Sequence, residues 1–256
     1  MNEAPILANV RIVLVEPRGA FNIGSVVRAM KNMGFKDLAL VDPVDFHNDD
    51  AYKACVGARD VLERASVFST LEDAIRDTRL VVGTTRRAGR MRKIGCSLEE
   101  LHKKIFPALK GGKAAVLFGR EECGLSNRET DLCNILVRIP ANPRFPSLNL
   151  SHAVAVVCYR LFVESMAGEA SQGSHAVSQH VPQPVTNAAL EELLDYMRFA
   201  FTDIGFFTKG TPSYVIPLFR RIFGRALLDD EELRDLTHIF HRLYGLFREK
   251  KRPAAK

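Results

Sequence analysis

Three polar loops are the part of this sequence that is best suited to chemistry. Each follows a short apolar run that is typical of a strand, and they cover residues 16–22, 119–125 and 139–150. In an open parallel sheet, ligands bind outside the carboxyl ends of the strands. We therefore expect the three loops to contribute to one binding site.

The first loop leads into a helical pattern that carries Asn22 and Arg28. The two residues are six positions apart, close to two helical turns, so both can face one site. Arg28 lies between Val27 and Ala29 on an otherwise apolar face, where a buried guanidinium requires an anionic partner. Asn22 has a simpler alternative role, as the cap of this helix. The pattern favours a site for an anionic ligand.

The third loop contains three prolines and two asparagines, which predicts a rigid polar segment. Such a segment can clamp a ligand, although it is also typical of an ordinary turn. The sequence has no GxGxxG after a strand and no GxxxxGK[ST], GxSxG or HExxH. Its seven histidines show no metal-ligand spacing. These absences disfavour nicotinamide, P-loop and zinc chemistry, and we expect no bound metal.

The elements that hold these loops alternate in type along the first 165 residues. Strand-like apolar runs occupy 10–15, 38–41, 80–83, 115–118 and 135–137. Helical patterns lie between and after them, over 22–34, where Gly34 can end the helix, and over 147–163. This alternation predicts an α/β domain with a mainly parallel sheet.

A change in composition near residue 166 predicts a second unit. The stretch 168–184 is rich in Ser, Gln, Gly, His and Pro, which is typical of a linker. Apolar stripes at helical spacing then return at 190–201 and 233–247, and Asp229 or Asp230 can cap the later helix. We expect an α/β domain over 1–165, a flexible linker over 166–187 and a small basic helical domain over 188–256.

Charge and cysteine content narrow the class of protein. The net charge is +6, and residues 209–256 carry eleven Lys or Arg against six Asp or Glu. Residues 86–93 form a second basic cluster without any acid. Basic patches suit phosphate backbones or anionic membranes, although a solvated surface is an equally good reading. Five cysteines without a CxxC pair, no secretory signal and no span-length apolar run indicate a cytoplasmic protein that is not in a membrane.

The three loops also resemble the motifs of a known family. Residues 13–16 with 22–34 resemble the first motif of the SPOUT RNA 2′-O-methyltransferases. Residues 117–125 resemble the second motif, and 139–143 with 147–154 resemble the third, in the same order and spacing. The resemblance covers roughly 9–165 and is looser over the helical tail. It is closest to bacterial enzymes that methylate the ribose of a tRNA cytidine or uridine, at position 32 of the anticodon loop.

This resemblance implies a fold, a cofactor and partners. The sheet would end in a deep C-terminal trefoil knot, the cofactor would be S-adenosyl-L-methionine, and tRNA would be methylated by a homodimer with composite active sites. The family's cofactor contacts fall on Thr84, Thr85, Arg86, Gly119, Ile139, Pro146, Ser147, Leu148 and Asn149. Its catalytic residues fall on Arg28 and Asn22, and its second-motif acid falls on Glu121. We assign RNA binding to Arg18, Arg87, Arg90 and Arg120.

The expected reaction places limits on these residues. A ribose 2′-OH must lose its proton as the methyl group transfers, and no His, Asp or Glu in the loops is an obvious base. Arginine does not readily deprotonate, because its pKa exceeds about 12. We therefore expect Arg28 to orient a phosphate or hydroxyl and to stabilise developing alkoxide charge. The alternatives are a ribosomal RNA 2′-O-methyltransferase of the same fold and a non-catalytic RNA-binding relative.

Overall fold

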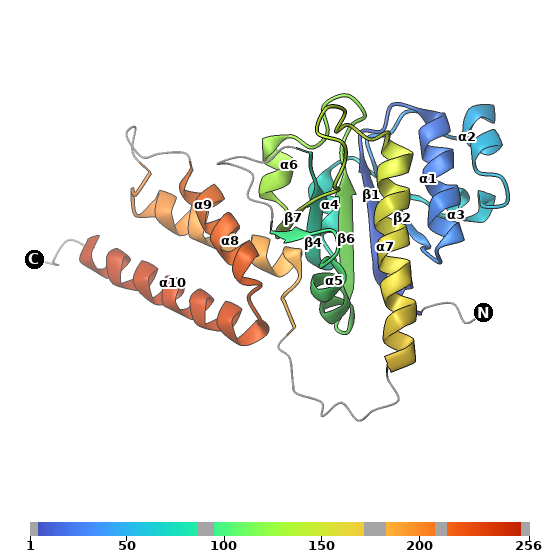
Figure 1. The fold of residues 1–256 in the computed structure, drawn as a ribbon. Coiled ribbons are helices and arrows are strands. Elements are labelled where there is room, and N and C mark those ends of the chain that lie inside the picture. The colour runs from blue at the N-terminus through green and yellow to red at the C-terminus, as the bar shows by residue number, and fades with distance from the viewer. Residues whose placement is uncertain (1–4, 87–94, 172–182, 208–213, 252–256) are drawn as a thin grey trace, which may run out of the picture.

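The computed structural model describes residues 5–86, 95–171, 183–207 and 214–251 (Figure 1). Its strands are β1 (Val10–Val15), β2 (Asp37–Val41), β3 (Ser66–Phe68), β4 (Thr78–Thr84), β5 (Cys96–Ser97), β6 (Lys113–Phe118) and β7 (Ile135–Arg138). Its helices are η1 (Pro5–Asn9), α1 (Ala20–Asn32), α2 (Asp49–Ala54), α3 (Arg59–Glu63), α4 (Leu71–Ile75), α5 (His102–Leu109), α6 (Asn127–Asp131), α7 (Leu150–Ser171), α8 (Asn187–Asp203), α9 (Val215–Ala226) and α10 (Asp230–Lys251).

The strands form one parallel sheet in the order β3-β2-β1-β6-β4-β7-β5. All six residues of β1 are buried, as expected of a strand that is covered on both faces. Alternate strand residues pack with α1, α2, α3, α5 and α7 on one face and with α4 on the other. Every expected strand lies within an observed one, and the α/β fold with a parallel sheet is confirmed. The short strands β3 and β5 at the two edges were not predicted.

Helix α1 starts earlier than the sequence suggested. It begins at Ala20 with Gly19 in the capping position, so the expected capping role of Asn22 is wrong. Asn22 instead lies in the first turn, and its amide is free to reach across to other loops. The helix ends at Asn32, and Gly34 closes it two residues later, as predicted, with a φ of 78° that suits a residue without a Cβ.

Helix α7 begins at Leu150 and leaves 147–149 in the preceding loop. Its 18 residues from Leu150 to Ala167, with a mean hydropathy of 1.3, are long and apolar enough to cross a membrane by length and composition. The short apolar runs of the sequence did not predict this property. One side of the helix, with Val154, Val157 and Leu161, is fully buried in the core beside α1. That is the position of a helix that covers a sheet.

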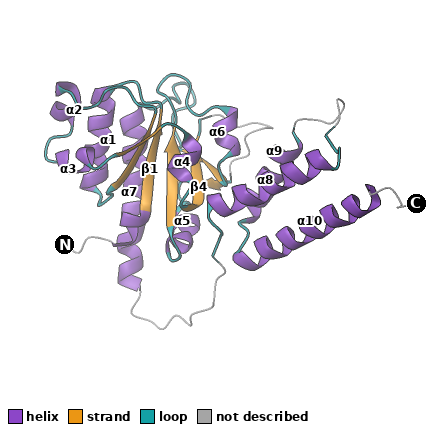
Figure 2. Cartoon of the chain, turned by 180° about the vertical axis from the view of Figure 1, so that it is seen from behind, coloured by secondary structure: helices purple, strands orange, loops and turns teal. Residues whose placement is uncertain are grey.

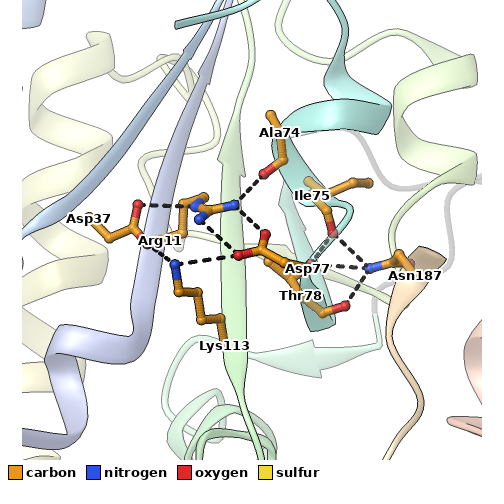
Figure 3. Close-up of polar contacts among 8 residues, drawn as sticks. All are labelled: Arg11, Asp37, Ala74, Ile75, Asp77, Thr78, Lys113 and Asn187. Carbon is orange, nitrogen blue, oxygen red and sulfur yellow. Dashed lines mark hydrogen bonds and ion pairs between the residues drawn. The ribbon is translucent and has the colours of Figure 1, made fainter. Parts of the chain in front are cut away.

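A polar cluster around the buried Arg11 joins the amino ends of four strands (Figure 3). Arg11 on β1 donates from Nε to Asp37 at 3.0 Å and from Nη1 to Asp77 at 2.5 Å. Lys113 at the start of β6 contacts the same two carboxylates, at 3.1 and 3.4 Å. The cluster lies at the edge of the sheet opposite the three polar loops, so it holds the strands together away from the expected site.

The helical tail packs on the α/β domain (Figure 2). Asn187, which opens α8, donates to the carbonyl of Thr78 at 3.0 Å, and Asn134 donates to the carbonyl of Gly224 in α9 at 2.8 Å. Asn134 also accepts from the Val81 N–H of β4 at 2.6 Å. These contacts dock the tail against β4.

The tail has its own small apolar core, formed by α8, α9 and α10. The predicted stripe on α10 is only half used for packing: Leu233, Leu236 and Phe240 join this core, whereas Leu243 and Phe247 are exposed. The side chain of Asp229 caps the helix by accepting from the N–H of Glu232, as anticipated. Of the expected linker 166–187, residues 166–171 extend α7, and 172–182 lie outside the described residues. The expected division into domains stays a prediction.

Candidate functional site

A cleft opens at the carboxyl ends of β4, β6 and β7. The residues that line it come from all three of these strand ends and from the start of α7: Thr84, Thr85, Arg86, Phe118, Gly119, Arg120, Glu121, Glu122, Cys123, Gly124, Leu125, Ile139, Pro146, Ser147, Leu148, Leu150 and Ala153. Eight of the nine residues expected to bind a cofactor are in this set, and Asn149 is the exception. The structure therefore brings the expected ligand residues together at the predicted edge of the sheet.

The loop 119–125 is folded back on itself and forms one wall of the cleft. The Gly124 N–H donates to the carbonyl oxygen of Arg120 at 2.9 Å, which closes a tight turn. A Cβ on Gly119 would lie 2.1 Å from the Gly124 backbone, so this close approach requires glycine. Gly124 itself has a φ of 69°, a conformation that other residues rarely adopt.

A chain of three side chains connects the three predicted motifs. Asn22 on α1 donates from Nδ2 to Oε1 of Glu121 at 3.0 Å. Asn149 donates from Nδ2 to Oδ1 of Asn22, also at 3.0 Å. The backbone N–H groups of Arg18 and Gly19 donate to the same carboxylate of Glu121, each at 3.2 Å. The residues of the first, second and third motifs therefore meet beside the cleft, although they are far apart in sequence.

The surroundings of Glu121 favour its ionised form. Burial alone would raise its pKa, but the hydrogen bonds from Asn22 and from backbone N–H groups outweigh burial and lower the pKa below the ordinary value. A carboxylate with a lowered pKa is a firm hydrogen-bond acceptor near neutral pH and a weak proton acceptor. Glu121 is therefore suited to hold Asn22 and the start of α1, not to remove a proton from a substrate.

The position of the Arg28 side chain differs from the one predicted. It is exposed on α1, so the predicted burial of its guanidinium is wrong. It does not line the cleft, and it makes no hydrogen bond or ion pair with any residue that the structure describes. Because residues of an α-helix advance by about 100°, Arg28 and Asn22 point in different directions around α1. Arg28 thus presents a free positive charge to the outside of the molecule.

The four arginines assigned to RNA binding have different surroundings. Arg87 and Arg90 lie outside the described residues. Arg18 is exposed and pairs with Glu16 at 2.9 Å. Arg120 is only 22% exposed and is held between the carboxylates of Glu16 and Glu129. Its positive charge is therefore largely neutralised within the protein.

Sequence reasoning missed both partners of Arg120. Glu16 follows β1 with a φ of 46°, an unusual conformation for a residue with a side chain. Glu129 belongs to a capping box with Ser126 at the start of α6. The capping box is visible in the sequence as Ser-x-x-Glu, but nothing local shows that its carboxylate also reaches Arg120. Among the described residues, no group of three or more His, Cys, Asp or Glu is arranged to hold a metal.

The fold and the site define an α/β protein with a cleft at the carboxyl edge of a parallel sheet. The model of the SpoU rRNA Methylase family matches residues 9–159, more than half of the chain. The chain belongs to this family and is a methyltransferase.

Named relatives match nearly the whole chain. A tRNA (cytidine/uridine-2'-O-)-methyltransferase TrmJ from Citrobacter koseri is 36% identical over 91% of this chain and 96% of its own length. The crystal structure of TrmJ from Z. mobilis ZM4 superposes with a TM-score of 0.77 at 29% identity, and covers 91% of this chain and 98% of its own. A probable methylase family protein from Haemophilus influenzae Rd KW20 gives 0.62 at 31% identity, over 96% and 100%. The similarity includes the helical tail as well as the sheet.

Proposed function

We propose that this protein transfers a methyl group from S-adenosyl-L-methionine to a ribose 2′-OH of tRNA, at the cytidine or uridine in position 32 of the anticodon loop. The observation that carries the proposal is the cleft itself, which gathers eight of the nine expected cofactor residues beside the Asn22–Glu121–Asn149 chain. The names and lengths of the relatives support tRNA as the substrate.

The cleft fits S-adenosyl-L-methionine in its chemistry. Its apolar side chains Phe118, Leu125, Ile139 and Leu148 suit a purine ring, and the loops around them offer backbone N–H and C=O groups. Glu121 and Glu122 add negative charge, which suits a ligand that carries a sulfonium and an ammonium group. The bound cofactor would supply an already activated methyl group, so placement of the two reactants can provide much of the acceleration.

The protein's own residues then bind and orient the RNA. Glu121 fixes Asn22, and Asn22 fixes Asn149 at the edge of the cleft. Arg28 is exposed and is available to an RNA phosphate or to the reacting hydroxyl, where its charge stabilises a developing alkoxide. We assign no proton acceptor to these residues, because the pKa of Glu121 is lowered.

We also propose a homodimer. Helix α7 presents four exposed apolar side chains at successive spacings of three, four and three: Val156, Tyr159, Val163 and Met166. This spacing makes a continuous stripe on one side of the helix, opposite the side that packs on the sheet. A second copy of the chain would cover this stripe. In a composite active site, one copy brings Arg28 toward the cleft of the other, which accounts for the absence of Arg28 from the lining of its own cleft.

The trefoil knot and the cytoplasmic location belong to the same proposal. Strand β7 lies near one edge of the sheet, whereas α7 packs on α1 toward the other side. The segment 139–149 therefore crosses the carboxyl edge of the sheet beside the 119–125 loop, which supports threading of the chain there. All five cysteines are free, which supports a reducing compartment such as the cytoplasm.

The second candidate is ribosomal RNA methylation, which the family description favours. A non-catalytic RNA-binding relative is a third reading, and the assembled cleft with its Asn22–Glu121–Asn149 chain speaks against it. The test is to incubate unmodified tRNA and rRNA with the protein and S-adenosyl-L-methionine and to map the methylated riboses. A methyl group at tRNA position 32 supports the proposal. Methylation of rRNA alone supports the second candidate, and no methylation of either supports the third.

A further inference from the structure

The guanidinium of Arg120 is clasped by two carboxylates from different parts of the chain. Its Nε donates to Glu16 at 2.9 Å, and Nη1 and Nη2 donate to Glu129 at 3.1 and 2.9 Å. A further bond joins Nη2 to the other oxygen of Glu16. Arg120 therefore forms a bidentate pair with each carboxylate, which is the strongest geometry for an arginine–carboxylate pair. Arg120 donates four hydrogen bonds inside the protein, so few of its N–H groups are available to a phosphate.

The clasp joins three elements at the mouth of the cleft. Glu16 directly follows β1, Glu129 lies in α6, and Arg120 is the second residue of the loop 119–125 after β6. The main chain of Arg120 accepts the turn-closing bond from Gly124, and the next residue is Glu121. The position of Arg120 therefore determines where the Glu121 carboxylate meets Asn22 and where one wall of the cleft lies.

We propose that Arg120 is a positioning residue for methyl transfer: by tying β1 and α6 to the loop 119–125, it sets the cofactor cleft and aims Glu121 at Asn22. The inference rests on the proposed function. It replaces the RNA-binding role that the sequence suggested for this arginine, because the side chain is mostly buried and its charge is already paired.

Removal of the guanidinium would leave two facing carboxylates without the cation that bridges them. Hydrogen bonding by Arg120 lowers the pKa of Glu16, so Glu16 is ionised near neutral pH. Arg18 is exposed and, of these two carboxylates, contacts only Glu16, so among the described residues no cation would bridge the half-buried pair. They would repel each other, and the end of β1 would separate from α6. The loop 119–125 forms one wall of the cleft, and it would shift when the side chain at position 120 no longer holds it. Both cofactor affinity and turnover would then fall, because each depends on this wall.

The experiment compares the full-length Arg120→Met variant with wild-type protein and with a matched control, Arg128→Met. Arg128 is 86% exposed on the same helix as Glu129 and pairs with Glu72 outside the cleft. For Arg120→Met we expect S-adenosyl-L-methionine affinity and kcat each to fall by about 10- to 100-fold, the cost of a small misplacement. We expect no change in the salt dependence of RNA binding, and faster hydrogen exchange at the Gly124 amide in cofactor-free protein. Arg128→Met should match wild type in all four measurements.

Two further variants separate positioning from general stability. Arg120→Lys keeps the charge but cannot form bidentate pairs with both carboxylates, so its cofactor affinity and kcat should remain reduced. Adding Glu16→Gln to Arg120→Met removes the repulsion and should recover part of the cofactor affinity. A role in stability alone would lower the melting temperature of Arg120→Met and leave its cofactor affinity and kcat unchanged, and this result would overturn the proposal.

The outcomes also distinguish this inference from the proposed function. If Arg120→Met binds cofactor normally but binds RNA weakly, with a salt dependence flattened by roughly 0.7–0.9 in log–log slope, Arg120 contacts a phosphate and the positioning role is wrong. If wild type is active and Arg120→Met is equally active, the positioning role alone is wrong. If wild-type protein neither binds the cofactor nor methylates RNA, the proposed function is wrong and this inference falls with it.

Discussion

Asn149 donates a hydrogen bond to Asn22 over 3.0 Å, although 127 positions separate the two residues in the chain. The bond joins the loop just before α7 to the first turn of α1 and places the third motif against the first. Because Asn22 also donates to Glu121, a change at any one of these residues is transmitted to the other two.

Asn149→Ala should therefore impair the reaction more than it impairs the fold. The side chain is exposed but also accepts from the Ser151 N–H at the start of α7, so its loss should lower the free energy of unfolding by about 1 kcal/mol, as for a helix cap. Loss of the bond to Asn22 should lower kcat by about 10²-fold, because the reacting groups depend on exact placement. The matched control is Asn48→Ala, which removes a helix cap on α2 and should cost about 1 kcal/mol of stability without affecting kcat. Equal kcat values for Asn149→Ala and wild type would refute the connection.

The lowered pKa of Glu121 predicts how stability depends on pH. A carboxyl group whose pKa is lower in the folded state than in the unfolded state stabilises the fold above the unfolded value, about 4.3 for Glu. This stabilisation is lost as the pH falls through the folded value. Glu121→Gln cannot ionise and should lack this contribution.

The measurement is urea unfolding of wild type and Glu121→Gln between pH 7 and pH 3. Wild type should be the more stable of the two at pH 7, and the difference should shrink below about pH 4.3. A difference that stays constant over the whole range would mean that Glu121 does not titrate with a lowered pKa.

The exposed apolar stripe on α7 predicts that a charged residue placed there will prevent dimer formation. Tyr159 is 59% exposed near the middle of the stripe, so Tyr159→Asp would place a charge in the proposed interface. Light scattering at micromolar concentration should give a dimer for wild type and a monomer for the variant. Phe199→Asp is the control, since Phe199 is equally exposed, at 57%, but lies on α8 outside the stripe. A monomeric, active wild-type protein would contradict the proposed dimer.

The basic end of the tail predicts how RNA affinity depends on salt. Arg242, Arg248, Lys250 and Lys251 follow one another closely near the end of α10. Their replacement by Gln should weaken RNA binding and reduce the log–log salt slope by roughly 0.7–0.9 for each phosphate that the tail no longer neutralises. The control replaces four exposed basic residues of the α/β domain by Gln: Lys53, Arg59, Arg64 and Lys103. Identical slopes for the two variants would show that the charges of the tail are merely solvated.

Much of the sheet could be predicted because the relevant signal is local. The apolar runs of β1, β2, β4, β6 and β7 are buried on both faces, and such runs are visible in the sequence. The short edge strands β3 and β5 are not, because three or two residues carry no periodicity. The gathering of the three loops followed from parallel strands ending at one edge, whereas the assignment of Thr84, Gly119 and Ser147 to a cofactor came from family resemblance.

The sequence-based predictions failed where a contact joins residues that are far apart in the chain. Asn22 looked like a helix cap because the sequence shows a suitable residue at the start of a helix, but its partner Glu121 is 99 positions away. Arg28 looked buried because its sequence neighbours are apolar, yet the helix turns its side chain outward. The docking of the tail through Asn187 and Asn134 depends on backbone carbonyls of other elements, and no sequence pattern indicates such acceptors.

Transfer of a labelled methyl group from S-adenosyl-L-methionine to unmodified tRNA tests the proposed reaction. Wild-type protein should label the tRNA, and a tRNA with 2′-deoxyribose at position 32 should accept no label. Arg28→Ala should lose transfer but keep its fold and cofactor affinity, because Arg28 is exposed and lies outside the cleft. Label on the 2′-deoxy tRNA, or near wild-type transfer by Arg28→Ala, would show that the proposed reaction is wrong.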